Sequence, residues 1–464
     1  MDQTVEFDRA LLQRYNATGP RYTSYPTANR FHEAFGPEDL ARSARWSNED
    51  LIPNPLSLYV HIPFCETVCF YCGCNKIPTK DHGKAEPYLE ALRKEALLLE
   101  DFFDMDRRVE QMHWGGGTPT FLGMQQMKEL MFFIRSNFNL RDDDHGEYSI
   151  EIDPRDASDE MIAMLREIGF NRLSFGIQDF NEKVQIAVNR VQPLEQTMAA
   201  YRAARANGFQ SINFDLIYGL PFQSIDTFAA TVDTVLEARP DRIAVFNYAH
   251  LPHLFKPQRR INEEDLPSPE EKLGILQHTI EQLTGAGYIY IGLDHFALPD
   301  DELALAQRDG SLYRNFQGFS AHSECDLIAL GVSSIGKVGD CYYQNERSID
   351  AYYTAIDREQ LPVARGIQLT ADDIIRREVI NSLICYSRLE FAGIDEKYGL
   401  EFEEYFAEEL EHLQVPLADG LVSLHDRVLT VNPRGKLLVR NIAMIFDVYL
   451  REAGDNITQF SRVI

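Results

Sequence analysis

Four cysteines lie close together in the segment CETVCFYCGC, which begins at Cys65. Cys65, Cys69 and Cys72 have the spacing C-x3-C-x2-C. Iron–sulfur clusters are held by thiolates, one to each iron. Three thiolates therefore predict a [4Fe-4S] cluster with one iron left open to bind a substrate or cofactor. Only Gly73 separates Cys74 from Cys72, so we expect Cys74 not to reach another corner of the same cluster.

Two other kinds of site could use these cysteines. A structural zinc ion usually takes pairs of ligands from separate segments, and a ferredoxin-type centre would need a fourth thiolate, which Cys74 could supply. Because all four thiols lie in one short loop, the open cluster is the preferred interpretation. The remaining cysteines are scattered and are expected to be small buried hydrophobic residues: Cys325, Cys341 and Cys385.

A second motif, GGGTPT, covers residues 115–120. Consecutive glycines let a backbone approach a ligand closely and expose its N–H groups. The same residues could form only a tight turn. Their position one predicted strand after the cysteine loop favours a ligand-binding role.

The composition limits the class of protein. The chain has 464 residues, of which 44% are hydrophobic, and a formal net charge of -27. This length predicts a large domain and a smaller one, and the charge argues against nucleic acid as a partner. The N-terminal segment MDQTVEFDRA lacks the features of a signal peptide, and no long uncharged apolar stretch follows. We therefore expect no membrane association and a reducing, cytoplasmic location.

Strand-like and helical patterns alternate from residue 56 onward. Apolar steps of three and four predict helices over 88–103 and 124–138, and Ser158 is a candidate cap for another. Strands that alternate with helices form parallel sheets. The expected fold is α/β, an incomplete parallel (β/α)6 barrel with its active site at the carboxyl ends of the strands. Its six strands are expected at 56–64, 110–117, 147–154, 171–178, 211–221 and 242–251.

The pattern changes before and after this region. Residues 1–50 lack the alternation and are expected to form an N-terminal arm. Residues 51–364 would form the catalytic barrel, with a helix from Pro269 and a strand over 288–296 at its edge. Residues 365–464 predict a mainly helical C-terminal domain, with helices over 372–387 and 402–413, a hairpin within 418–435 and a final helix.

The cysteine loop after the first strand and GGGTPT after the second resemble the radical S-adenosylmethionine (SAM) superfamily. The resemblance implies that the amino and carboxylate groups of SAM chelate the open iron. It also implies that an electron from the cluster cleaves SAM to a 5′-deoxyadenosyl radical, which takes hydrogen from an unactivated carbon.

Two longer strings narrow the resemblance. RYTSYPTA at 21–28 and PFCETVCFYCGCNK at 63–76 are similar to segments of the oxygen-independent coproporphyrinogen III oxidases of heme biosynthesis, also called coproporphyrinogen dehydrogenases. The likeness continues nearly to the end of the chain, through EIDPR, SFGIQDF, INFDLIYGLP, NYAHLP, NFQGF, GVSSIG and NPRGKLLVRNIAMIFDVYL. It implies that two propionates of coproporphyrinogen III are oxidatively decarboxylated to vinyls, which gives protoporphyrinogen IX.

The resemblance also implies particular roles for individual residues. Cys65, Cys69 and Cys72 would hold one cluster, and two SAM molecules would bind. The first SAM would contact Tyr59, Gly116, Glu151 and Ile335. The second SAM would contact Tyr71, Gly117, Thr118, Gln178, Arg190, Asp215 and Ala249. Cys74, Phe316 and Gln317 match family positions assigned to the catalytic centre. Without the resemblance, loop capping, backbone hydrogen bonds and surface exposure would explain the polar members of this set.

Substrate-binding residues are harder to identify. Four substrate carboxylates on an acidic protein require a local basic patch, and Tyr22 and Tyr25 could cover a flat macrocycle. Ordinary packing and exposed surface are the alternatives. The candidate basic residues are Arg21, Arg30, Lys256, Arg259 and Arg260.

Two related functions remain open: a radical SAM heme chaperone and a heme-degrading radical SAM enzyme. Chaperone-like relatives typically lack RYTSYPTA and the counterpart of Cys74, and this chain has both. We expect a monomer that takes electrons from a flavodoxin- or ferredoxin-type donor and passes one to an unidentified acceptor.

Overall fold

The computed structural model of the protein describes residues 4–322 and 324–453. The chain divides into two compact units, each assembled from separate segments. Unit 1 comprises Met1–Arg30, Pro269–Ser323 and Leu369–Ile464, and unit 2 comprises Phe31–Ser268 and Glu324–Gln368. The domains expected from the sequence, 1–50, 51–364 and 365–464, are continuous segments and stay a prediction.

Unit 2 contains the six parallel strands that the sequence predicts. Each strand pairs in parallel with the next in the order β1, β4, β6, β7, β8, β9. Their bounds are β1 Leu56–Ile62, β4 Arg108–Gly116, β6 Glu147–Ile152, β7 Arg172–Gln178, β8 Ser211–Tyr218 and β9 Arg242–Asn247. The carboxyl ends of all six therefore meet at one edge. The polar residues at the strand ends are thereby brought together.

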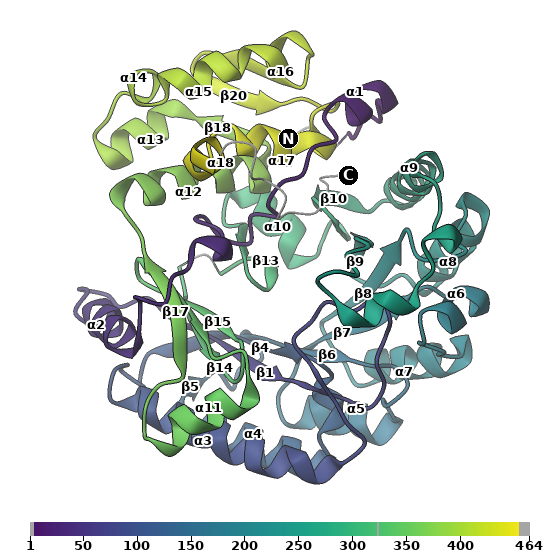
Figure 1. Ribbon diagram of the computed structural model, residues 1–464, viewed down its shortest axis with the longest axis vertical. Helices are drawn as coiled ribbons and strands as arrows, with labels where there is room; N and C mark the ends of the chain where they lie inside the picture. Colours follow the sequence, from purple (N-terminus) through teal and green to yellow (C-terminus); the bar gives the residue numbers. More distant parts are fainter. Residues whose placement is uncertain (1–3, 323, 454–464) are drawn as a thin grey trace. The chain divides into compact units, whose positions relative to one another are not determined.

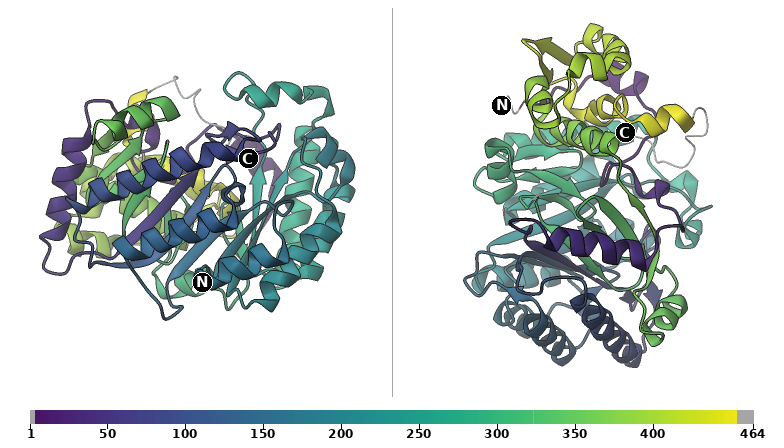
Figure 2. Two further views of the ribbon diagram at one scale, coloured as in Figure 1. Left: turned by 90° about the horizontal axis from the view of Figure 1, so that it is seen from below. Right: turned by 90° about the vertical axis from the view of Figure 1, so that its left-hand side faces the viewer.

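Helices between these strands cover one face of the sheet, as Figures 1 and 2 show. Their bounds are α3 Ala85–Glu100, α4 Met124–Asn137, α5 Asp159–Glu167, α6 Glu182–Ala187, α7 Leu194–Ala206 and α8 Ile225–Ala238. On α3 the apolar residues Leu89, Leu92 and Ala96 are buried, as the helical spacing predicts. The Ser158 side chain accepts a hydrogen bond from the Met161 N–H and caps α5.

The sheet of unit 2 continues beyond β1, which the sequence analysis missed. Strand β14, Asp326–Leu330, pairs in parallel with β1, and β15, β16 and β17 follow in antiparallel order. These last three strands cover Ile335–Val338, Cys341–Asn345 and Val363–Gln368, and β5, Asn139–Leu140, pairs with β4. Every residue of β14 and β16 is buried, so neither strand has the polar alternation that marks a half-exposed strand. Two helices also belong to unit 2, α2 Pro37–Asn48 and α11 Ile349–Asp357.

Unit 1 is mainly helical. Its helices are α1 Arg9–Arg14, α9 Pro269–Gly285, α10 Glu302–Asp309, α12 Ala371–Tyr386, α13 Phe391–Tyr398, α14 Phe402–Tyr405, α15 Ala407–His412, α16 Gln414–Ala418, α17 Val439–Met444 and α18 Val448–Ala453. The predicted hairpin is present as β19 Val422–His425 and β20 Val428–Val431, and β18 Arg388–Glu390 joins it. Stacked Phe391 and Phe402, with ring centroids 3.9 Å apart, lie in the core of this unit.

Two details of unit 1 differ from the sequence prediction. The single strand expected over 288–296 is a hairpin of β10 Ile289–Gly292 and β11 His295–Ala297, because Leu293 turns the chain at a φ of 54°. A second small hairpin pairs β12 Tyr313–Asn315 with β13 Gly318–Ser320. The helix expected over 402–413 is divided into α14 and α15 at Phe406, whose φ is -106° and ψ is 30°. None of the described helices is long and apolar enough to cross a membrane.

Candidate active site

The cysteine loop begins where β1 ends and is closed on itself by backbone hydrogen bonds. Strand β2, Phe64–Cys65, pairs with β3, Ile77–Pro78, and the Ile77 N–H donates to the Pro63 carbonyl at 2.7 Å. Cys65 and Cys69 are buried, Cys72 is partly exposed and Cys74 is exposed. The loop therefore presents three thiols in a shape that its own backbone maintains.

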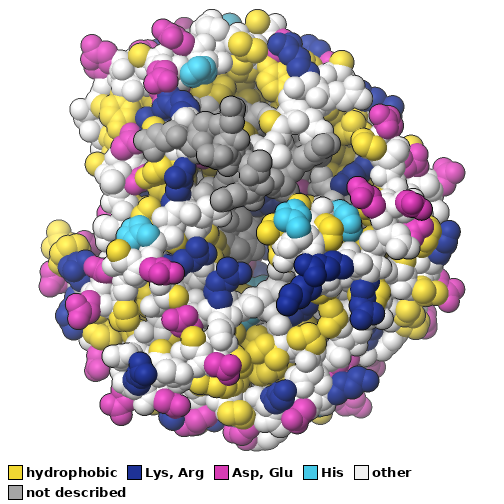
Figure 3. All heavy atoms as spheres, viewed as in Figure 1, with side chains coloured by type: hydrophobic (Ala, Val, Ile, Leu, Met, Phe, Trp, Pro, Cys, Tyr) yellow, Lys and Arg dark blue, Asp and Glu magenta, His cyan; other side chains and the backbone are white. Residues whose placement is uncertain are grey.

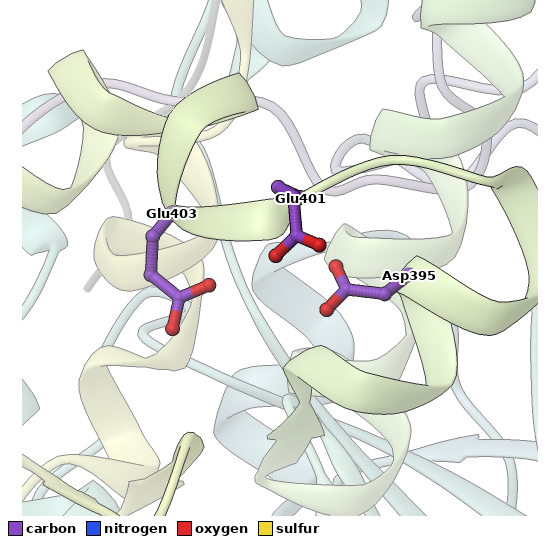
Figure 4. A group of neighbouring side chains, drawn as sticks. All are labelled: Asp395, Glu401 and Glu403. Atoms are coloured by element: carbon purple, nitrogen blue, oxygen red, sulfur yellow. The ribbon is translucent and has the colours of Figure 1, made fainter.

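The spacing of the thiols fits a cluster better than a single ion. A tetrahedral zinc ion with bonds of about 2.3 Å would bring its sulfur ligands within about 3.8 Å of one another. Among the described residues, one group of three or more ligands lies within 4.8 Å, and it comprises Asp395, Glu401 and Glu403 (Figure 4). That group belongs to unit 1, and Arg427 Nη2 binds two of its carboxylates, at 2.7 Å from Asp395 and 2.5 Å from Glu403. No three of the described loop cysteines lie that close to one another, so they do not form a ready tetrahedral zinc site, whereas ligands to separate irons need not meet at one point.

Hydrogen-bond donors approach the loop sulfurs. Thr118 Oγ1 donates to Cys65 Sγ at 3.5 Å, and Arg190 Nη1 donates to Cys69 Sγ at 3.5 Å. A hydrogen bond from the Cys74 thiol is the main cause that lowers the pKa of Cys72 to about 6, and the nearby Lys76 ammonium adds to the effect. Donors of this kind stabilise thiolates, the form that binds iron. The assignment of Cys74 as a non-ligand stays a prediction.

The glycine turn at the end of β4 packs on the cysteine loop. The Gly117 N–H donates to the Ile62 carbonyl and the Thr118 N–H to the Phe64 carbonyl, both at 2.8 Å. A Cβ on Gly117 would lie 2.7 Å from the Pro63 carbonyl carbon. Gly116 has a φ of 113°, and a Cβ there would lie 2.5 Å from the His61 ring. Glycine is therefore required for backbone packing against the cysteine loop, whether or not a ligand also lies there.

Aromatic and carboxylate side chains meet beside this turn. Glu151 Oε2 accepts a hydrogen bond from the Gly116 N–H at 3.2 Å, and Glu151 Oε1 lies 3.4 Å from His113 Nε2. Burial alone would raise the pKa of Glu151, but the hydrogen bond and charge of His113 and the Gly116 N–H hold it below its usual value. The Tyr59 ring stacks on His113 with centroids 5.9 Å apart, and its hydroxyl lies 3.0 Å from His61 Nδ1. Tyr59 and Glu151, both predicted to contact SAM, are thus joined through the histidines.

The predicted second-SAM residues at β7 and β8 have partners within the protein. Arg190 Nη1 forms an ion pair with Asp153 at 3.0 Å, and Arg190 Nη2 donates to the Gly176 carbonyl at 2.7 Å. Asp215 accepts hydrogen bonds from Ser174 and Asn213, both at 2.8 Å. Burial raises the pKa of Asp215 to about 6. Both residues thus have partners within the protein, and their contact with a second SAM stays a prediction.

Two buried atoms of this group remain without a hydrogen-bond partner among the described residues: Gln178 Oε1 and Arg190 Nε. Gln178 ends β7 at a bulge and has a φ of 68°, an uncommon conformation for a residue with a side chain. Unpaired buried polar atoms are costly. They mark a place where a polar ligand would fit.

The other predicted SAM contacts lie on neighbouring segments of unit 2. The Tyr71 carbonyl accepts a hydrogen bond from Gln258 Nε2 at 2.9 Å, and the Tyr71 ring packs on the small apolar cluster of Val184, Val188, Leu220, Tyr248 and Ile261. Ala249 follows β9, and Ile335 begins β15.

The catalytic and substrate candidates outside this region belong to unit 1. Arg21 Nη1 forms an ion pair with Asp294 at 2.9 Å, and Tyr22 donates to Asp447 at 2.9 Å. Tyr25 accepts the Val448 N–H at 3.3 Å, and Arg30 donates to the Tyr449 carbonyl at 2.6 Å. Phe316 and Gln317 lie in the turn between β12 and β13, and both side-chain amide atoms of Gln317 are buried without a partner among the described residues. The roles of these residues in substrate binding stay predictions.

Sequence reasoning missed three residues of the site: His61, His113 and Asp153. His61 follows Tyr59 by two residues on β1, and His113 precedes Gly115 by two on β4. Residues two apart on a strand share a face, so the two-residue period of these strands could have indicated that both histidines lie beside the predicted site residues. Asp153 is the first residue after β6, where the carboxyl end of a strand makes a polar residue notable.

Comparison with known proteins identifies the family. The model of the Radical SAM superfamily matches residues 59–235, and that of the HemN C-terminal domain matches residues 369–438. An oxygen-independent coproporphyrinogen III oxidase from Pseudomonas aeruginosa is 53% identical over 464 residues, which cover 100% of both chains. This chain belongs to the oxygen-independent coproporphyrinogen III oxidase family.

Other members of the family are also similar to this chain over nearly its whole length. The oxygen-independent coproporphyrinogen III oxidase of Escherichia coli K12 is 51% identical, over 100% of this chain and 99% of its own length. The solved structure of coproporphyrinogen III oxidase (HemN) from Escherichia coli, described as a radical SAM enzyme, has a TM-score of 0.91 at 48% identity. It covers 96% of this chain and 100% of the solved chain. The radical SAM fold expected from the sequence is confirmed, and membership of this family implies a [4Fe-4S] cluster and SAM.

Proposed function

We propose that the protein oxidises coproporphyrinogen III without oxygen and converts two propionates to vinyls, which yields protoporphyrinogen IX in heme biosynthesis. The observation that carries this proposal is the identity of 53% over the whole chain, together with a three-thiol loop beside the Gly116–Glu151 contact. Each propionate would lose a β-hydrogen atom, a further electron and CO2. The electron donor would be a flavodoxin or ferredoxin, and we expect a cytoplasmic monomer.

The residues present fit a cluster and SAM. Cys65, Cys69 and Cys72 would hold the cluster; bound together, cluster and SAM supply the 5′-deoxyadenosyl radical. The ionised Glu151 carboxylate suits a ligand amino or hydroxyl group, because His113 and the Gly116 N–H keep its pKa low. Tyr59 offers an aromatic face in the same place. The contribution of the chain is to position the reacting groups and exclude side reactions.

A second SAM at Gln178, Arg190 and Asp215 is the finer part of the proposal. Its support is the pair of unpartnered buried atoms, Gln178 Oε1 and Arg190 Nε. Equilibrium binding of radiolabelled SAM should give two molecules per chain, and about one in the Gln178→Ala and Asp215→Ala variants. Glu195→Ala, at an exposed helix position, is the matched control. One SAM in the unmodified protein, or two in both variants, would contradict the assignment.

The activity itself is tested by anaerobic turnover of coproporphyrinogen III with SAM and a chemical reductant. We expect protoporphyrinogen IX and two CO2 per substrate, and none of either with Cys69→Ala. Failure to form product by a protein that carries the cluster and cleaves SAM would overturn the proposal. Stoichiometric heme binding by that protein would instead favour the chaperone, and opening of heme would favour the heme-degrading enzyme.

A further inference from the structure

A basic segment packs directly on the cysteine loop. This segment is η4, Lys256–Arg260, with the sequence KPQRR. Gln258 Nε2 donates to the Tyr71 carbonyl at 2.9 Å, and the Arg260 guanidinium lies 5.5 Å from the centroid of the Phe70 ring. Phe255 approaches Gly73 so closely that a Cβ there would lie 3.1 Å from its ring. The residues that flank Cys69 and Cys72 are therefore covered by this one segment.

The cationic side chains of η4 are accessible to solvent, although Arg259 Nε donates to the Pro252 carbonyl at 2.9 Å and Arg260 lies over the Phe70 ring. Lys256, Arg259 and Arg260 are exposed, and none of them forms an ion pair within the described part of the chain. Leu254 beside them is 59% exposed. On the face shown in Figure 3, Lys and Arg side chains gather in groups, some of them beside His side chains. Three exposed cations without an ion pair among the described residues stand out on a chain of net charge -27, although the acidic segment η5, Glu263–Asp265, follows them in the chain.

We propose that Leu254, Lys256, Arg259 and Arg260 form a docking surface for an acidic one-electron carrier protein that reduces the cluster. The inference rests on the proposed function, because radical SAM chemistry requires such an electron. In the step, the carrier is oxidised by one electron, the cluster is reduced by one, and no bond is formed or broken. Electron transfer weakens steeply with distance, so the carrier must dock beside the cysteine loop. The docking surface meets this requirement because Arg260 and Gln258 of η4 contact Phe70 and Tyr71, which lie in that loop.

Charge complementarity selects the acidic class of carrier. The protein as a whole repels anionic proteins, so a local cationic surface both orients such a carrier and suppresses other encounters. Substrate carboxylates are the competing occupants. Radical chemistry on a substrate calls for a site that excludes water, whereas the three cations are exposed. The observations therefore favour the carrier.

The test reverses charge on this surface. The Lys256→Glu/Arg259→Glu variant is compared with Lys94→Glu/Arg202→Glu, which makes the same charge change at exposed positions of α3 and α7. Stopped-flow absorbance measures anaerobic cluster reduction by reduced flavodoxin as a function of salt. Photoreduced 5-deazariboflavin, which is uncharged, serves as the reductant that needs no docking.

We expect the docking-surface variant to be reduced by flavodoxin about tenfold more slowly at low salt and to lose most of its salt dependence. The control variant should change less than twofold, and both should form product normally with deazariboflavin. A flavodoxin rate equal to that of the unmodified protein would overturn the proposal. A raised KM for coproporphyrinogen III at an unchanged flavodoxin rate would assign the residues to the substrate. Absence of product with deazariboflavin in the unmodified protein would instead refute the proposed function.

Discussion

Glu95 on α3 is a buried carboxylate whose protonation should be visible in the stability of the protein. It is 2% exposed. Its Oε2 accepts the Gly331 N–H at 2.8 Å and the Tyr352 hydroxyl at 2.6 Å, and its Oε1 accepts the Asn345 amide at 2.6 Å. Burial raises the pKa of Glu95 to about 7, although the three donors oppose the shift. Glu95 thereby joins three segments: the residue after β14, the end of β16 and helix α11.

The sign of the pH effect follows from this shift. The pKa in the folded state, about 7, lies above the ordinary value of 4.5, so the folded protein binds the proton more tightly than the unfolded chain. The resulting stability is fully present below pH 4.5 and is lost as the pH rises through 7. Between pH 5 and pH 8 the loss is about 2.5 kcal/mol.

Glu95→Gln removes the titration while keeping the size of the side chain. We expect the free energy of unfolding of the unmodified protein, relative to this variant, to fall by about 2.5 kcal/mol from pH 5 to pH 8. Anaerobic urea unfolding, followed by tryptophan fluorescence, measures both proteins at each pH. Glu95→Ala leaves three donors without an acceptor and should cost about 3–5 kcal/mol. The same pH dependence in the unmodified protein and the Gln variant would refute the reasoning.

Three further predictions concern the cysteine loop and the sheet. Cys74→Ser should retain about four irons per chain, and loss of the cluster in iron analysis and absorbance would contradict the three-ligand assignment. Gly117→Ala should reduce cluster incorporation and SAM binding at least tenfold, because its Cβ would lie 2.7 Å from the Pro63 carbonyl carbon. Normal cluster content, and normal SAM affinity in equilibrium dialysis, would argue against the packing of Gly117 on the cysteine loop. Arg107→Met should destabilise the protein by about 3–5 kcal/mol, since it removes the guanidinium that lies 2.6 Å from the buried Asp326 carboxylate. A decrease in the free energy of unfolding below about 1 kcal/mol, measured by urea unfolding, would disprove a structural role for the pair.

Local patterns explain which parts of the fold were predictable. The six parallel strands and the Ser158 cap depend on residues near one another in the sequence, and both were found. Strands β14 and β16 are buried throughout, so their sequences lack the alternation that would have shown them. The break at Phe406 separates segments that both have helical spacing, and tertiary packing decides such a break.

The candidate site likewise contains features that could be predicted from the sequence and contacts that could not. The three thiols lie in one loop, so their spacing could be read directly from the sequence. Contacts such as His113 with Glu151 and Arg190 with Asp153 join different strands and segments. They depend on the register between neighbouring strands, which a single sequence does not specify. The ion pair of Arg190 with Asp153 was therefore missed.

The hydrogen bonds between the glycine turn and the cysteine loop have a consequence for maturation. Gly117 and Thr118 bind the backbone of Ile62 and Phe64, and β2 and β3 close the loop by themselves. None of these bonds involves a thiol, so we expect the loop to keep this shape before iron arrives. Cluster insertion would then require little change in the loop backbone, in contrast to a segment that folds only when it binds metal. The apoprotein should accept a cluster without unfolding. SAM should bind after the cluster, because the open iron that would hold its amino and carboxylate groups is absent until then.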